Sequence, residues 1–185
     1  MVLLENERIV LESLDARHAE ALLAYHDRNR AHLEPWEPAR DPDFYELAYH
    51  RETIRISLDN AAIGASERFV AVERATAQIV ANVNLWNIRR GVVQAAVLGY
   101  SVDALAQGHG YATTCARAVV DHAFGTLGLH RIETSYNPIN AASARVLRKI
   151  GFTVEGYARD YLFIGGAWRD AILVGLVNPA PTILA

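Results

Sequence analysis

One segment in the second half of the sequence constrains the fold more than any other. An apolar strand pattern that contains Leu98, Gly99 and Tyr100 leads into a loop with Gly108 and Gly110, and an alanine-rich helical pattern follows. Glycines lack a Cβ, so the backbone of such a loop can approach a ligand closely. The free N–H groups at the helix start, with the helix dipole behind them, form an anion site. The segment therefore predicts a strand, a loop and a helix that together can hold a pyrophosphate.

Two common nucleotide-binding motifs do not match this loop. The dinucleotide fingerprint requires a third glycine where the chain has Thr113, and the P-loop requires a Gly-Lys-Ser/Thr sequence that does not follow here. A Gly-x-Gly sequence is also typical of a tight strand-to-helix turn that binds nothing. The fuller pattern in this chain is Gln107-x-x-Gly110-x-Ala112. This pattern matches neither of the two common nucleotide-binding motifs.

Hydrophobic periodicity along the rest of the chain predicts one mixed domain. Strand patterns occupy residues 8–12, 69–71, 79–85, 92–102, 131–136, 152–155 with 161–164, and 168–177. Helical patterns begin after Asp15 and occupy residues 43–58, 112–127 and 140–150, and the proline-bearing residues 29–43 predict a loop. We expect Asn140 to cap the last helix, Gly151 to end it, and Gly165 with Gly166 to form the final hairpin turn.

Composition excludes several other classes of protein. The chain has 185 residues, which fits a single domain with its own core. Its net charge of −3 gives no general attraction to nucleic acid or anionic lipid. One cysteine, Cys115, excludes an internal disulfide and a cysteine-rich zinc site, and no apolar run approaches the ~20 residues that span a bilayer. We expect a cytoplasmic protein with no metal site, no direct nucleic-acid partner and no membrane partner.

Short motifs spread over nearly the whole chain resemble one family. They are Asn29-Arg30-x-His32-Leu33-x-Pro35-Trp36-Glu37-Pro38, Leu98-Gly99-Tyr100, Gln107-x-x-Gly110-x-Ala112, His130-Arg131-Ile132, Asn137-x-x-Asn140-x-x-Ser143, Gly151-Phe152, Glu155-Gly156 and Asp160-Tyr161-Leu162. Together they resemble the GNAT acetyltransferase superfamily and, within it, the RimJ/RimL branch, which acetylates N-terminal residues of ribosomal proteins. The early Trp-Glu-Pro segment and the later Trp168-Arg169-Asp170 segment are closer to the RimJ side.

The resemblance implies a fold and a donor site. The GNAT fold is α/β (α+β), with a central, mixed, mostly antiparallel sheet of about seven strands, a splayed parallel pair and about four flanking helices. It would occupy residues 1–178 as a single domain, with 179–185 as a C-terminal tail. Acetyl-CoA would lie between the splayed strands, and a bulged N–H near Gly99 would polarise its thioester carbonyl. The implied acetyl-CoA contacts are Leu98, Gly99, Tyr100, Val102, Gln107, Gly108, His109, Gly110, Tyr111, Ala112 and Asn140.

The resemblance also implies two catalytic groups, Asp160 as general base and Ser143 as proton donor to the leaving thiolate. An α-amine with a pKa of about 7.7–8.0 costs only ~1 kcal/mol to deprotonate at pH 7, so a modest base acting through water would suffice. Each residue also has a simpler interpretation, because Ser143 follows a helix cap and Asp160 could be a solvated strand-edge residue. None of Ala96, Val97 and Leu98 supplies a carboxylate on the central strand.

The acceptor site is the least constrained part of the sequence. Trp36 and Glu37 lie between prolines on a loop, where binding residues are common, although a hydrophobic plug at a helix end is the alternative. The resemblance implies the N-terminal α-amine of a protein, of the ribosomal-protein-alanine type, as acceptor. The expected assembly is a monomer or homodimer, and the sequence does not distinguish the two. A polyamine, an antibiotic or another small amine remains an alternative acceptor, and a non-catalytic acyl-CoA-binding module remains an alternative function.

Overall fold

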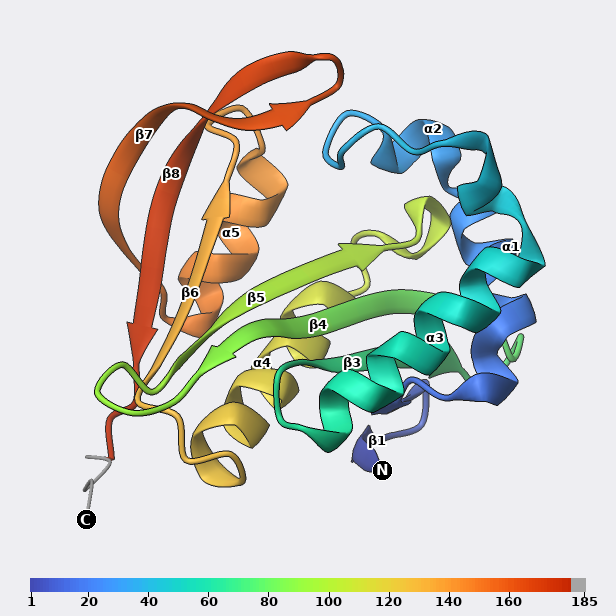
Figure 1. The fold of residues 1–185 in the computed structure, drawn as a ribbon, viewed down its shortest axis with the longest axis horizontal. Coiled ribbons are helices and arrows are strands. Elements are labelled where there is room, and N and C mark those ends of the chain that lie inside the picture. The colour runs from blue at the N-terminus through green and yellow to red at the C-terminus, as the bar shows by residue number, and fades with distance from the viewer. Residues whose placement is uncertain (181–185) are drawn as a thin grey trace.

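The computed structural model describes residues 1–180, which form one eight-stranded sheet in the order β1-β2-β3-β4-β5-β6-β8-β7 (Figure 1). The strands are β1 (Val2–Glu5), β2 (Ile9–Ser13), β3 (Glu67–Glu73), β4 (Ile79–Arg89), β5 (Ala95–Val102), β6 (Arg131–Tyr136), β7 (Thr153–Ile164) and β8 (Ala167–Val177). The α-helices are α1 (Ala19–Arg28), α2 (Arg30–Leu33), α3 (Leu47–Ala62), α4 (Tyr111–Gly125) and α5 (Ala141–Ile150). Neighbouring strands run antiparallel except β5 and β6, which are parallel. The predicted fold class is confirmed, with one strand and one α-helix more than expected in the described residues.

The N-terminal third differs most from the sequence prediction. The first strand, Val2–Glu5, was not predicted, and α2 interrupts the predicted loop. The second long helix begins at Leu47 rather than at residue 43, because Pro42–Tyr45 forms a separate 3-10 turn and Glu46 has extended backbone with φ −106° and ψ 144°. Pro42 can begin that short turn because its missing N–H would have no helical partner there. The buried Phe44 therefore belongs to the turn and not to the helix.

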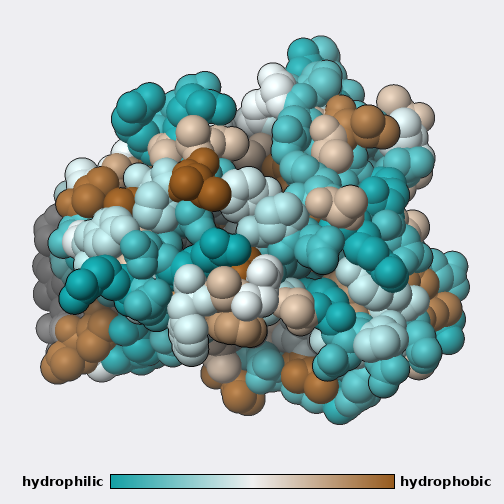
Figure 2. Space-filling view, turned by 90° about the horizontal axis from the view of Figure 1, so that it is seen from above, coloured by the Kyte–Doolittle hydropathy of each residue, from teal (hydrophilic) through white to brown (hydrophobic). Residues whose placement is uncertain are grey.

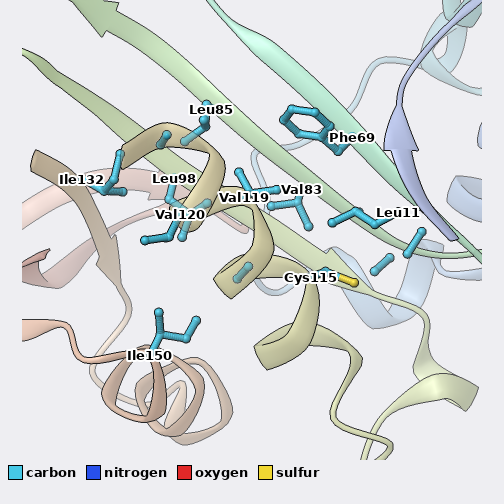
Figure 3. Packing of buried hydrophobic residues seen from close by; sticks show 14 of the residues in the cluster. Leu11, Phe69, Val83, Leu85, Leu98, Cys115, Val119, Val120, Ile132 and Ile150 are labelled. Atoms are coloured by element: carbon cyan, nitrogen blue, oxygen red, sulfur yellow. The ribbon is translucent and has the colours of Figure 1, made fainter. Parts of the chain in front are cut away.

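Helices cover both faces of the sheet and create two cores. In Figure 3, α4 lays Cys115, Val119 and Val120 against Val83 of β4 and Leu98 of β5, with all of these side chains buried. On the opposite face, α1 and α3 pack against β3 and β4 in a second, smaller cluster (Figure 1). Burial of apolar surface on both faces holds the central strands rigidly in place. The sheet can therefore position groups at the carboxyl end of β5.

Local signals at the element ends behave as the sequence indicates. Asn140 caps α5 by accepting the N–H of Ser143 at 3.0 Å, and Gly151 ends the helix with φ 111°. The final hairpin turns at Gly165 and Gly166, which have φ 60° and 73°. Strand β7 runs through the predicted gap at residues 156–160, and its register on β8 shifts between Ala158 and Leu162.

The remaining expectations concern the chain as a whole. Strand β8 ends at Val177, and residues 181–185 of the expected tail lie outside the described residues. No helix within residues 1–180 is both long and apolar enough to cross a bilayer.

Candidate active site

The two parallel strands at the centre of the sheet separate along their length. β5 and β6 pair only at Ala95 with Arg131, Ala96 with Ile132 and Val97 with Glu133. Within residues 1–180, β5 then continues to Val102 paired only with β4, and β6 continues to Tyr136 paired only with β8. Figure 1 shows the opening between them. Each strand therefore presents an unpaired backbone edge to the space between the strands.

This opening widens into a cleft of about 1240 Å³. One wall is the loop after α2, with Pro35, Trp36 and Glu37, and the other is the tip of the β7–β8 hairpin, with Tyr161 and Arg169. Viewed from above, this side of the molecule is mostly hydrophilic, with scattered hydrophobic patches (Figure 2). The cleft exceeds the roughly 300–1,000 Å³ of an ordinary small-molecule site, so it has room for two reactants.

The sequence-predicted donor residues fall into two groups. Leu98, Gly99, Tyr100 and Asn140 line the cleft. Val102 and residues 107–112 do not line it, and they lie at and beyond the carboxyl end of β5. The two groups are consistent with a long ligand whose arm enters the cleft and whose charged end remains outside.

The loop after β5 provides an open cradle for an anion. Gly108 and Gly110 have φ 79° and 82°, and a Cβ added at either glycine would meet no atom within 4 Å. Gly110 is the N-cap of α4 and supplies no side chain, so no side-chain cap covers the first N–H groups of that helix. The loop is held by Gln107, whose Nε2 lies 2.9 Å from Nε2 of His32, and by His109, whose Nδ1 lies 2.9 Å from the Gln107 carbonyl. The free edge of β5 and this cradle fit the pantetheine arm and the pyrophosphate of acetyl-CoA.

The expected bulge near Gly99 is not present. Pairing of β4 with β5 is regular from Ala81–Val102 to Trp86–Val97, and the register shift lies between Trp86 and Arg89 on β4. The irregularity is in β4 because Asn87 adopts a left-handed backbone with φ 52°. Free N–H groups on β5 arise instead from its separation from β6.

Ser143 lies on the cleft beside a second hydroxyl. Its Oγ is 2.9 Å from the phenol oxygen of Tyr100, and its backbone N–H is held by Asn140. Burial raises the pKa of Tyr100 to about 12, against the opposing effect of the hydrogen bond with Ser143. The phenol therefore stays protonated near neutral pH. The sequence predicted Tyr100 only as a backbone contact, and no local signal links it to a residue on α5.

The proposed base Asp160 is not on the cleft wall. It is exposed at the register shift of β7 with φ 47°, and its backbone N–H donates to Oδ1 of Asp170 at 2.9 Å. Asp170 lines the cleft and also accepts a hydrogen bond from the hydroxyl of Tyr157. That hydrogen bond, followed by the one from the Asp160 N–H, lowers the pKa of Asp170. The carboxylate that the hairpin presents to the cleft is thus ten residues further along the chain than the sequence pattern indicated.

Other carboxylates of the cleft are paired with arginines. Glu133, at the point where the strands separate, accepts hydrogen bonds from Arg89 and Arg131, and Arg131 also binds Glu155. Burial opposes ionisation of Glu133, but the two arginine hydrogen bonds outweigh it and lower its pKa. Glu133 and Glu155 are therefore both held in ion pairs with arginines.

The two predicted acceptor residues lie together on the cleft. Trp36 is 37% exposed, so it does not act as a buried plug. Glu37 pairs with Arg40 at 2.8 Å. Sequence reasoning did not identify four further lining residues on this side, which are His26, His50, Arg68 and Asn82.

A sheet that opens between parallel neighbours, next to an uncapped helix start, can hold a long ligand with an anionic end. The chain matches the family described as the acetyltransferase (GNAT) domain over residues 8–153, and it belongs to this family. It is therefore an N-acetyltransferase that uses acetyl-CoA.

Similar proteins agree on this class. The chain is 33% identical over 178 residues to the [ribosomal protein uS5]-alanine N-acetyltransferase of Escherichia coli K12, covering 96% of this chain and 92% of that protein. The crystal structure of the ribosomal-protein-S5-alanine acetyltransferase from Vibrio fischeri has a TM-score of 0.94 at 33% identity, covering 97% of both chains. RimJ from Mycobacterium smegmatis in complex with CoA-disulfide has a TM-score of 0.86 at 31% identity, covering 91% of this chain and 81% of that one.

Proposed function

We propose that this enzyme acetylates the N-terminal α-amine of a protein, with a ribosomal protein that begins with alanine as the model acceptor. The similar enzymes named for that reaction support the proposal, because the alignment with them spans nearly the whole chain. An acceptor of this kind implies that the enzyme acts in the cytoplasm.

The charge balance of the cleft is the observation that carries this choice of acceptor. Four carboxylates line the cleft, and each either forms an ion pair or accepts a hydrogen bond within the protein. They are Glu37, Glu133, Glu155 and Asp170. Four arginines also line it, which are Arg40, Arg68, Arg89 and Arg169. Three of these carboxylates are in ion pairs with arginines, and Asp170 accepts hydrogen bonds only from the neutral Tyr157 hydroxyl and the Asp160 N–H. A polyamine or cationic antibiotic would require several unpaired negative charges, so this lining favours a peptide with a single terminal amine.

Acetyl-CoA, when bound, supplies the activated acetyl thioester. Backbone groups on the free edge of β5, near Gly99, orient the arm, and a free N–H there donates to the acetyl carbonyl oxygen. Amides of residues 107–112 and the start of α4 hold the pyrophosphate. Asn140 lies beside the arm on the cleft wall. These assignments rest on the family resemblance and on the fit of the free edge and the uncapped helix.

Two hydroxyls serve the leaving sulfur in this proposal. Ser143 donates a hydrogen bond to the thiolate, and the phenol of Tyr100 orients the serine hydroxyl from 2.9 Å away. A hydroxyl pair of this kind can pass a proton to sulfur as the carbon–sulfur bond breaks.

In this proposal, a carboxylate of the β7–β8 hairpin accepts the proton of the acceptor amine. The geometry favours Asp170 over Asp160, because Asp170 lines the cleft whereas Asp160 is exposed. Asp160 positions Asp170 through its backbone N–H, and its carboxylate can act only through water. The α-amine requires little assistance near neutral pH, so a carboxylate with a low pKa is adequate.

A panel of acceptors tests the proposed function. We expect acetylation of peptides that begin with Ala or Ser, and none of the same peptides with blocked N-termini. A peptide with an internal lysine and a blocked N-terminus, together with spermidine, serves as the comparison under matched conditions. Faster turnover of lysine or spermidine would contradict the proposal, and binding of CoA without any turnover would favour a non-catalytic module.

A further inference from the structure

An arginine in the acceptor half of the cleft has no carboxylate partner. Arg68 of β3 is half-buried, lines the cleft and forms no ion pair with any residue of 1–180. Its Nε donates one long hydrogen bond, of 3.4 Å, to Oδ1 of Asn84. Desolvation lowers the pKa of Arg68, and a guanidinium remains charged even so. A desolvated cation without a counter-ion is costly, which points to an anion supplied from outside the protein.

Two buried acceptor atoms beside Arg68 are also unpaired. His50 and Asn82 are 2% and 6% exposed and line the cleft, and neither His50 Nε2 nor Asn82 Oδ1 has a hydrogen-bond partner in the described residues. Desolvation lowers the pKa of His50, while its hydrogen bond to the Phe44 backbone opposes that shift. His50 is therefore neutral, and its Nε2 carries a lone pair. The wall offers one cation and two hydrogen-bond acceptors, which complement a carboxylate flanked by N–H groups.

A second histidine, His26, packs against His50. His26 stacks on His50 with ring centroids 5.4 Å apart and planes 12° apart. Burial, followed by the nearby His50, Arg40 and Arg68, lowers the pKa of His26 to about 3, so it is uncharged. The pair adds no competing positive charge near neutral pH, so the charged groups on this wall are Arg68 and the Glu37–Arg40 ion pair.

Strand register places Arg68 close to the expected reaction point. Arg68 of β3 is opposite Asn84 of β4, and Asn84 is opposite Gly99 of β5, so all three residues share one face of the sheet. Adjacent strands are ~4.8 Å apart, so the Cα atoms of Arg68 and Gly99 are separated by roughly 10 Å. An extended peptide advances ~3.3 Å per residue, and an arginine side chain spans part of the remaining gap. A peptide whose amine is near Gly99 would present its second or third side chain to Arg68.

We propose that Arg68, with His50, Asn82 and Asn84, forms a carboxylate-binding subsite that selects acceptor proteins with Asp or Glu at the second or third residue. Arg68 binds the carboxylate, and the unpaired atoms of His50 and Asn82 accept N–H groups of the same peptide. The inference rests on the proposed N-terminal acceptor and specifies which N-termini are preferred.

Steady-state kinetics on matched peptides tests the subsite. The peptides begin with Ala, carry Glu or Gln at position 2, 3 or 4, and are amidated at the C-terminus so that only the side chain supplies a carboxylate. We expect kcat/KM to be about 10- to 100-fold higher for Glu at position 2 or 3 than for Gln, mainly through KM. Equal rates for the Glu and Gln peptides would overturn the subsite while leaving the N-terminal acceptor intact. Failure of every peptide would refute the proposed function itself.

Two variants assign the preference to Arg68. In Arg68→Gln, the Glu-to-Gln ratio of kcat/KM should fall to near 1, because the variant loses the preference for the Glu peptide. Arg55→Gln, on the exposed face of α3, is the matched control and should retain the parent ratio. CoA affinity and melting temperature confirm that each variant is folded, and Arg68→Met, which also removes the charge, replaces Arg68→Gln if the latter is not. A parent-like ratio in a folded Arg68 variant would exclude the subsite. A dipeptide with a free C-terminus that outcompetes all amidated peptides would assign the site to a small acceptor instead and contradict the proposal.

Discussion

The phenol oxygen of Tyr100 lies 2.9 Å from Oγ of Ser143, although 43 residues separate them in the chain. The contact joins the free strand edge of β5 to the first turn of α5 across the cleft. It therefore connects the element that would orient the donor with the hydroxyl that would serve the leaving sulfur.

Removal of either hydroxyl should slow acetyl transfer. We expect Tyr100→Phe and Ser143→Ala to lower kcat by about 10-fold each, with the double variant no worse than about 30-fold because the groups act as a unit. CoA affinity, measured by calorimetry, should change little. If Ser143→Ala lowers only the melting temperature, its role is confined to the helix.

Tyr100 should also contribute to the alkaline stability of the fold. Its pKa of about 12 is above the ordinary value of 10.0, so the folded state holds the phenol proton more tightly than the unfolded state. This contribution is fully present below pH 10 and is lost as pH rises toward 12. Denaturant unfolding across that range should show a smaller pH dependence for Tyr100→Phe than for the parent, and equal slopes would contradict the assignment.

The glycine loop should tolerate a side chain poorly when the donor binds. Gly110 has φ 82°, a conformation that β-branched residues avoid, and it begins α4. We expect Gly110→Val to weaken CoA binding by about tenfold or more. Gly64→Val is the matched control, because Gly64 has φ 69° and equally open surroundings but follows α3. Unchanged affinity in a folded Gly110→Val protein would remove the pyrophosphate assignment.

Substitutions on the hairpin separate the two candidate bases. Asp170→Asn should lower kcat/KM by roughly 10²-fold at pH 7, and Asp160→Asn should have the smaller effect because its side chain is off the cleft wall. Both deficits should shrink as pH rises, since more of the amine is already deprotonated. Asp59→Asn on exposed α3 is the control. A larger loss of kcat/KM in Asp160→Asn than in Asp170→Asn would identify Asp160 as the base, as the family resemblance implies.

Asp103 should stabilise the contact between the C-terminal end of α1 and the loop that follows β5. It is 4% exposed, pairs with Arg28 at 2.5 Å and accepts from Asn29 Nδ2 at 2.9 Å. Burial opposes its ionisation, but these hydrogen bonds and the N–H of Leu105 outweigh it and lower its pKa. We expect Asp103→Ala to reduce the free energy of unfolding by about 3 kcal/mol. The contribution is present above the unfolded-state pKa of the carboxyl and is lost as pH falls. The difference in the free energy of unfolding between Asp103→Ala and the parent, measured by urea titration, should therefore become smaller at acidic pH.

The sequence predicted the features whose causes lie within a few residues. The helix start at Asn140, the left-handed stop at Gly151 and the hairpin turn at Gly165 depend on local backbone geometry, and each has the predicted role. The family motifs identified the acetyltransferase domain for the same reason, since each motif is a short contiguous pattern. The short strand Val2–Glu5 was missed because an edge strand of four residues carries little periodicity.

Only the tertiary structure decided which side chains meet in the cleft. Arg68, His50 and Asn82 come from β3, α3 and β4, and nothing near any of them in sequence signals a shared site. Asp170 lines the cleft, whereas Asp160 is exposed at a register shift in β7, and that irregular pairing is not visible in the sequence. Periodicity reveals which face of an element is buried, whereas sheet register and helix packing determine the distant residues that lie opposite it. The chain's own pattern thus determined the fold and the class of chemistry, and long-range packing determined the groups available to perform it.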